Sequence, residues 1–78
     1  MAYALTDAEA TFYFQAALKA AQLDSEEFIG LISWANMGDA HAMATAVSKW
    51  RDESCCGTDS ITTIINGQGY WFGYTYGH

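Results

Sequence analysis

Two adjacent cysteines and two histidines supply the thiols and imidazoles of this chain: Cys55, Cys56, His41 and His78. Structural zinc sites separate paired thiolates by about two to four residues, because adjacent cysteines project in different directions. A disulfide between neighbouring cysteines would close a strained ring. We therefore predict no metal site and no disulfide, with one cysteine buried as a small apolar side chain and the other partly exposed.

Catalysis by a thiol needs a histidine beside it and a carboxylate that orients the histidine. Cys56, His41 and either Asp39 or Asp52 supply these residue types, so a small cysteine-dependent enzyme is one alternative for this chain. No strand–nucleophile–helix motif brings the three groups together. The glycines of 67–69 precede no helix that would bind a phosphate. We expect the protein not to be an enzyme and to carry no cofactor.

The segment from Tyr70 to Tyr76 has five aromatic residues in seven positions. Tyrosine and tryptophan combine a large contact area with a polar tip, which is why they dominate protein interfaces. Because three short helices cannot cover every ring, we predict that at least two of Tyr70, Tyr74 and Tyr76 remain exposed or reach an interface. We interpret these three tyrosines as a protein-binding surface, with Phe12 as a further contact.

The chain is strongly acidic: its 78 residues include nine Asp and Glu against three Lys and Arg, for a net charge of −6. Nucleic-acid binding requires clustered cations that displace counterions, so we exclude direct binding to nucleic acid. An acidic surface keeps a small domain soluble, and it also steers encounters with a basic protein patch. The carboxylates predicted to steer such a partner are Glu26, Glu27, Asp52 and Asp59.

The first residues lack the basic stretch and apolar run of a secretion signal. No apolar run reaches the roughly eighteen residues that a membrane span requires. Adjacent cysteines cannot form the sequence-distant bridges that are typical of small secreted domains. We therefore expect a cytoplasmic protein with no membrane partner.

Capping signals and apolar spacing predict three short helices. Thr6 and Glu9 have the spacing of a capping box, and apolar residues then recur at helical intervals. A second start signal at Asp24 precedes apolar residues with the same period, and Asp39 can cap a third helix. The predicted helices span 7–22, 25–37 and 40–51.

After the polar connection over 52–60 the hydrophobic period becomes alternating, which predicts two strands over about 60–65 and 70–76. Asn66 and Gly67 suit the tight turn of a hairpin between them. In that pairing Tyr70, Tyr74 and Tyr76 share the face of Ile61, Thr63 and Ile65. Gly73 lies on the opposite face, where its missing side chain would allow a helix or a partner to approach closely.

These signals together predict a single small acidic α+β domain over 1–78, with three short α-helices followed by a C-terminal two-stranded antiparallel β-hairpin packed on them. In size and charge the chain is similar to small acidic host-directed proteins of phages, including anti-CRISPR proteins. That profile implies an inhibitor that occludes a larger protein target. Our leading hypothesis is a non-enzymatic protein-binding module. The alternative from another class is a structural homodimer joined through the edges of the hairpin.

Overall fold

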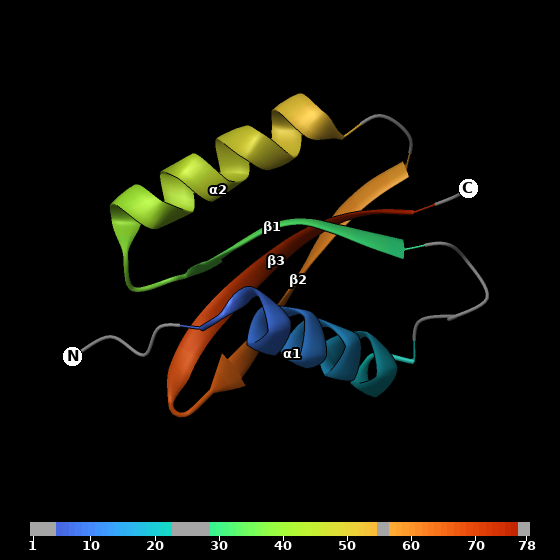
Figure 1. Cartoon of the computed structure of the whole chain (residues 1–78), viewed down its shortest axis with the longest axis vertical. Helices are drawn as coiled ribbons and strands as arrows, with labels where there is room; N and C mark the ends of the chain where they lie inside the picture. Colours follow the sequence, from blue (N-terminus) through green and yellow to red (C-terminus); the bar gives the residue numbers. More distant parts are fainter. Residues whose placement is uncertain (1–4, 23–28, 55–56, 77–78) are drawn as a thin grey trace.

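A computed structural model describes residues 5–22, 29–54 and 57–76, and its architecture is α+β. Two helices and a three-stranded antiparallel sheet with the order β1-β3-β2 make up this part of the chain. In Figure 1 the strands pass between α2 above and α1 below. The elements in chain order are α1 (Asp7–Ala20), β1 (Ile29–Asn36), α2 (Ala40–Glu53), β2 (Gly57–Ile65) and β3 (Gln68–Tyr76).

Both helices begin at the caps that the sequence predicts. The Thr6 hydroxyl accepts a hydrogen bond from the Glu9 amide at 3.1 Å, and the Glu9 carboxylate accepts one from the Thr6 amide at 2.9 Å. The Asp39 carboxylate accepts from the Ala42 amide at 3.0 Å, which fixes the start of α2. α1 ends two residues earlier than predicted, since Gln22 adopts a left-handed backbone with φ of 59°.

The helix predicted over 25–37 is wrong for residues 29–36, which form the strand β1; residues 25–28 lie outside the described residues. Leu31 lies opposite Tyr74 and Trp34 opposite Phe72, with the register shifting between Leu31 and Ser33. Because this bulge adds a residue to β1, two side chains three positions apart fall on one face of the sheet. The helix was predicted from the apolar spacing of Leu31, Ile32 and Ala35, but Leu31 and Ala35 lie on opposite faces of the sheet.

The predicted hairpin is confirmed, and its strands are longer than expected. Asn66 and Gly67 form a two-residue turn in which both φ values are positive, 51° and 80°. This turn type matches the twist of the flanking strands. β2 and β3 then pair without a register shift from Ile65 with Gln68 to Gly57 with Tyr76. The predicted grouping of the β3 tyrosines with Ile61, Thr63 and Ile65 on one face is therefore correct.

The face of the sheet that α1 covers holds the larger of two apolar clusters. Phe14 of α1 packs between Phe72 and Tyr74, with ring centroids 5.8 and 5.6 Å apart. Leu18, Ile65 and Tyr70 complete the centre of this cluster. We call this side of the sheet the α1 face.

The opposite side, which we call the α2 face, holds the second cluster around Trp71. Trp50 of α2 meets Trp71 edge to face, with centroids 5.7 Å apart, and Ala35 and Ala46 fill the space beside them. A Cβ on Gly73 would lie 2.6 Å from the Trp50 ring, so the close approach of a helix predicted at this glycine is confirmed. α2 packs on β1 and β3.

Candidate protein-binding surface

The exposure predicted for the β3 tyrosines is wrong for two of the three. Tyr70 is fully buried and Tyr74 is 4% exposed, whereas Tyr76 is 36% exposed. Phe14 and its neighbours on α1 cover the first two rings, because the sheet has helices on both faces and β1 beside β3. Only Tyr76, near the end of β3, is therefore accessible to a partner.

Tyr76 and Asp59 lie at the same end of the hairpin. Gly57 pairs with Tyr76, and the Tyr76 ring covers the position that a Gly57 side chain would take. Asp59 lies opposite Tyr74, and the Tyr74 and Tyr76 rings are 6.2 Å apart. Burial raises the pKa of the Tyr74 hydroxyl above its ordinary value, and the negative charge of Asp59 raises this pKa further. A carboxylate and an exposed ring thus flank the first residues of β2.

The other predicted contacts do not join this group. Phe12 is 65% exposed on α1 and meets the Tyr13 ring at 5.3 Å. Asp52 is exposed in the last turn of α2. Glu26 and Glu27 lie outside the described residues. The sequence prediction therefore combined residues from separate elements, and only Tyr76 and Asp59 of its set share one surface with the hairpin.

The outer edge of β2 is the feature that the sequence prediction missed. The turn pairs Ile65 with Gln68, and in a two-residue hairpin these two residues exchange main-chain hydrogen bonds. Main-chain groups alternate in direction along an antiparallel strand, so every second residue from Ile64 backward directs its N–H and C=O away from β3. These residues are Thr58, Ser60, Thr62 and Ile64, and we call them the β2 edge surface.

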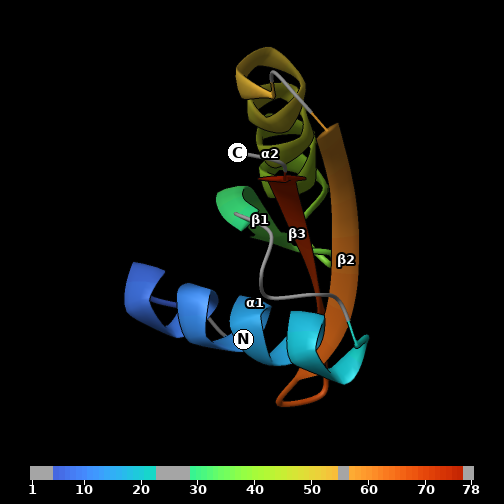
Figure 2. The ribbon, with the colours of Figure 1, turned by 90° about the vertical axis from the view of Figure 1, so that its right-hand side faces the viewer.

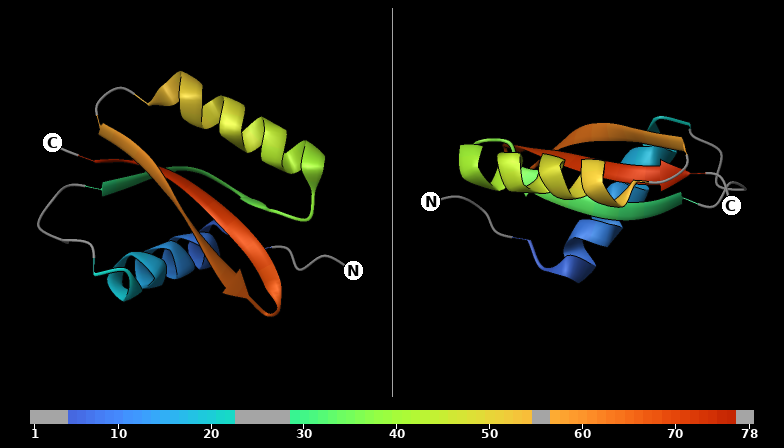
Figure 3. Two further views of the ribbon diagram at one scale, coloured as in Figure 1. Left: turned by 180° about the vertical axis from the view of Figure 1, so that it is seen from behind. Right: turned by 90° about the horizontal axis from the view of Figure 1, so that it is seen from above.

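The side chains of the β2 edge surface lie on the α2 face, but α2 does not cover them. Thr62 is exposed, Ile64 is 72% exposed, and Thr58 and Ser60 are half-buried. Among the described strands, none pairs with β2 on its outer side. Figure 2 shows β2 at the outer edge of the sheet, and the view from behind shows it in front of the other strands (Figure 3).

Asp59 partly blocks this edge. Its carboxylate accepts a hydrogen bond from the Ser60 amide at 2.8 Å. That amide is one of the outward-directed donors, so an added strand would have to displace the carboxylate to pair with it. Asp59 is also the one charged residue of β2, which contains no proline or lysine. Asp59 is therefore the one residue of β2 that opposes pairing with an added strand.

The thiol and metal candidates of the sequence are not brought together in the described residues. Cys55, Cys56 and His78 lie outside them, and His41 is exposed on α2. Within 5–22, 29–54 and 57–76, no group of three His, Cys, Asp or Glu side chains is placed to hold a metal ion. Neither described helix is long and apolar enough to cross a membrane.

Comparison with known proteins does not assign the chain to a family. No protein-family model matches it, and neither a curated protein nor a solved structure matches it. Its function must therefore be inferred from the surface itself.

Proposed function

We propose that this chain is a non-enzymatic protein-binding module that adds an extended segment of a partner protein to the outer edge of β2. The observation that supports this proposal is the β2 edge surface. Four residues direct their main-chain groups outward along a strand that pairs regularly over its full length. Strand addition obtains affinity from such main-chain groups.

Side chains beside the edge give the added strand something to contact. Thr62 and Ile64 project from the uncovered α2 face. β-Branched and apolar side chains favour cross-strand packing with an incoming strand. Tyr76 offers an aromatic contact near the opposite end of β2, on the α1 face, where its ring lies over Gly57. A larger protein whose functional segment was held in this way would be inhibited.

The decisive variant is Thr62→Pro, because it removes an outward N–H without removing a bond to β3. Thr62→Ala is the matched control, since it shortens the side chain and keeps the N–H. We expect peptides selected against the chain from a random phage-displayed library to lose at least about tenfold in affinity with Thr62→Pro, as is typical when a buried main-chain partner is lost. Binding to Thr62→Ala should change by less than about threefold.

Thermal melts of both variants establish that each is folded. Peptides that bind Thr62→Pro and the unchanged chain equally would refute strand addition at β2. A selection that yields no binder to the folded chain would also count against the proposal.

A second copy of the chain is the other candidate partner for the same edge. Antiparallel pairing of two β2 strands about Ile61 places Ser60 opposite Thr62 and Asp59 opposite Thr63, so no like charges face each other. The product is a six-stranded sheet, rather than the four-stranded sheet that two hairpins alone would form. Light scattering over a dilution series tests it: a mass of two chains that Thr62→Pro halves supports the homodimer, and a constant mass of one chain refutes it.

A further inference from the structure

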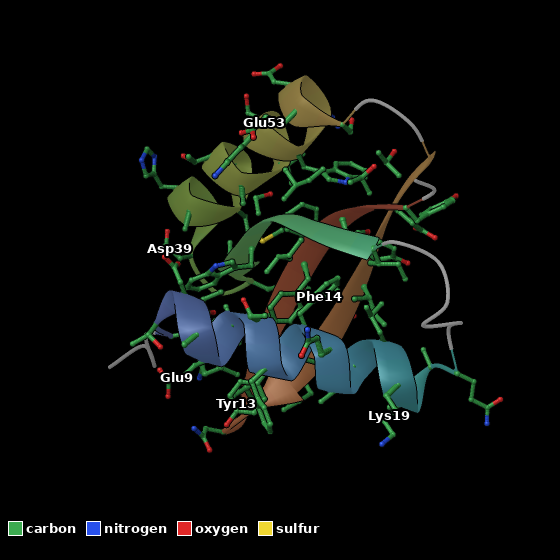
Figure 4. All side chains as sticks on the ribbon, turned by 45° about the vertical axis from the view of Figure 1, so that its right-hand side comes forward. Glu9, Tyr13, Phe14, Lys19, Asp39 and Glu53 are labelled. Carbon is green, nitrogen blue, oxygen red and sulfur yellow. The ribbon has the colours of Figure 1, made fainter. Side chains whose placement is uncertain are left out.

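A groove of about 640 Å³ runs along the outer edge of β1, at the opposite side of the sheet from β2. Residues 31–34 of β1 form its floor, and α1 and α2 form its two walls. Figure 4 shows β1 passing between α1 below it and α2 above it. The volume is within the range of about 300–1,000 Å³ that is typical of ligand sites. Neither the sequence prediction nor the proposed function uses this groove.

The two walls of the groove carry opposite charge. Asp7 and Thr11, one turn apart on α1, line one wall. His41, Thr45 and Lys49, on successive turns of α2, line the other. Lys49 is one of three lysines and arginines in the whole sequence, and it gives this wall of the groove a positive charge in an otherwise acidic molecule.

The floor offers main-chain groups as well as apolar side chains. The Met37 amide donates to the Gly69 carbonyl at 2.8 Å, so by alternation Ala35 and Ser33 direct their main-chain groups toward β3. Trp34, between them, directs its N–H and C=O outward into the groove. The bulge at Ile32 limits regular pairing to a short stretch. Contacts with the walls must therefore contribute to any binding here.

We propose that the groove binds a short extended peptide segment that lies beside β1 and whose successive side chains alternate in charge. Adjacent residues of an extended strand point to opposite faces of the sheet. An acidic side chain directed toward the α2 face then meets Lys49, and a basic side chain directed toward the α1 face meets Asp7. The floor fixes an extended backbone, and the two walls select its charge pattern.

Two blocked peptides of one composition test this pattern. Thr-Glu-Lys-Glu-Thr places its two acidic residues on one face and its lysine on the other. Glu-Thr-Glu-Thr-Lys places all three charged residues on one face. We expect the first peptide to bind about two- to fivefold more tightly, which is the range for solvent-exposed ion pairs, and to shift the amide resonances of residues 31–34 in an NMR titration.

Lys49→Glu should abolish the preference for the first peptide. Lys19→Glu changes the net charge equally at the far end of α1, outside the groove, and should leave the preference intact. The dispersed amide spectrum of each variant verifies its fold. Equal affinities for the two peptides, or equal effects of the two variants, would overturn the proposal. Shifts confined to Thr62 and Ile64 would also overturn it, and would support binding at the β2 edge surface instead.

Discussion

The two edges of the sheet present main-chain groups in different surroundings. Along β1 both helices rise beside the edge, a bulge interrupts the strand, and charged side chains line the walls. Along β2 the strand is regular, one face is uncovered, and Asp59 is the only charge. On our proposals, the walled edge of β1 selects its ligand through side chains, whereas the open edge of β2 binds mainly through the backbone. The placement of α2 over β1 and β3, and not over β2, is the origin of this difference.

α2 is placed by the glycine and the small side chains of the sheet. Gly73 admits the Trp50 ring to the surface of β3, and the Ser33 hydroxyl donates to the Ala46 carbonyl at 2.7 Å. Both contacts bring α2 over β1 and β3, so the helix leaves β2 uncovered on that face. One packing arrangement thus creates the groove and exposes the β2 edge surface.

The largest effect is expected from Phe72→Ala, which removes a fully buried ring from the central strand. Phe72 pairs with Trp34 on one side and Ile61 on the other, so both edges depend on it. Loss of a buried phenylalanine costs about 3–5 kcal/mol of unfolding free energy. Urea denaturation measures this loss. A loss below about 1 kcal/mol would show that β3 does not hold the two edges together.

Gly73→Ala should affect binding at the β1 groove and leave binding at the β2 edge surface unchanged. Its Cβ would overlap the Trp50 and Trp71 rings, and overpacking of this kind costs about 1–3 kcal/mol. We expect α2 to move and the charge preference of the groove to disappear, while peptides that depend on the Thr62 amide still bind.

Gly30→Ala in β1 is the matched control for this change. A Cβ at Gly30 meets only the Thr75 methyl group, at 3.8 Å. Urea denaturation should therefore show no loss of stability for this variant. If Gly73→Ala also left the free energy of unfolding and the charge preference of the groove unchanged, the approach of Trp50 to Gly73 would not determine the position of α2.

Local sequence signals predicted α1, α2 and the β2–β3 hairpin, but they did not predict β1. The capping box at Thr6, the cap at Asp39 and the turn at Asn66 each involve residues close in sequence, and each is present in the structure. β1 was missed because its pairing with β3 joins residues far apart in the chain. Leu31, Ile32 and Ala35 also have the spacing of one helix face, although Leu31 and Ala35 lie on opposite faces of the sheet. Two β-branched residues, Ile29 and Ile32, together with Gly30 were the available signals for a strand.

The same omission explains the error at the binding surface. Without β1, the hairpin had two open edges and too few elements to bury Tyr70 and Tyr74. With β1 beside β3 and a helix on each face, both rings enter the core and β2 alone remains open within the hairpin. The alternation of Thr58, Ser60, Thr62 and Ile64 was visible in the sequence. Their exposure depends on where α2 lies, which no local pattern encodes.

Ser33→Ala tests the second contact that places α2. The change removes one buried hydrogen bond, which is worth about 0.5–1.5 kcal/mol, while the Ala46 carbonyl keeps its bond within the helix. The preference of the groove for the alternating peptide should weaken, and binding at β2 should not change. Ser48→Ala, on an exposed position of α2, is the control and should have no effect. An equal effect of the two variants would show that the Ser33 hydroxyl does not position the helix.

The smallest effect is expected at alkaline pH and concerns the β2 side of the molecule. Burial, and then the charge of Asp59, raise the pKa of Tyr74 above its ordinary value of 10.0. As the pH rises, the Tyr74 hydroxyl therefore loses its proton in the unfolded chain before it does so in the folded chain. The contribution of Tyr74 to the free energy of unfolding is constant below about pH 10 and falls as the pH rises above it.

Urea denaturation across this range should show a steeper fall for the unchanged chain than for Tyr74→Phe, which lacks the ionisable group. Asp59→Asn should give an intermediate slope, because burial still acts on Tyr74 after the charge is removed. If Asp59→Asn and the unchanged chain had the same slope, the Asp59 carboxylate would lie away from Tyr74 in solution. The Asp59 carboxylate would then not accept the hydrogen bond from the Ser60 amide, and the outer edge of β2 would have no side chain that blocks an added strand.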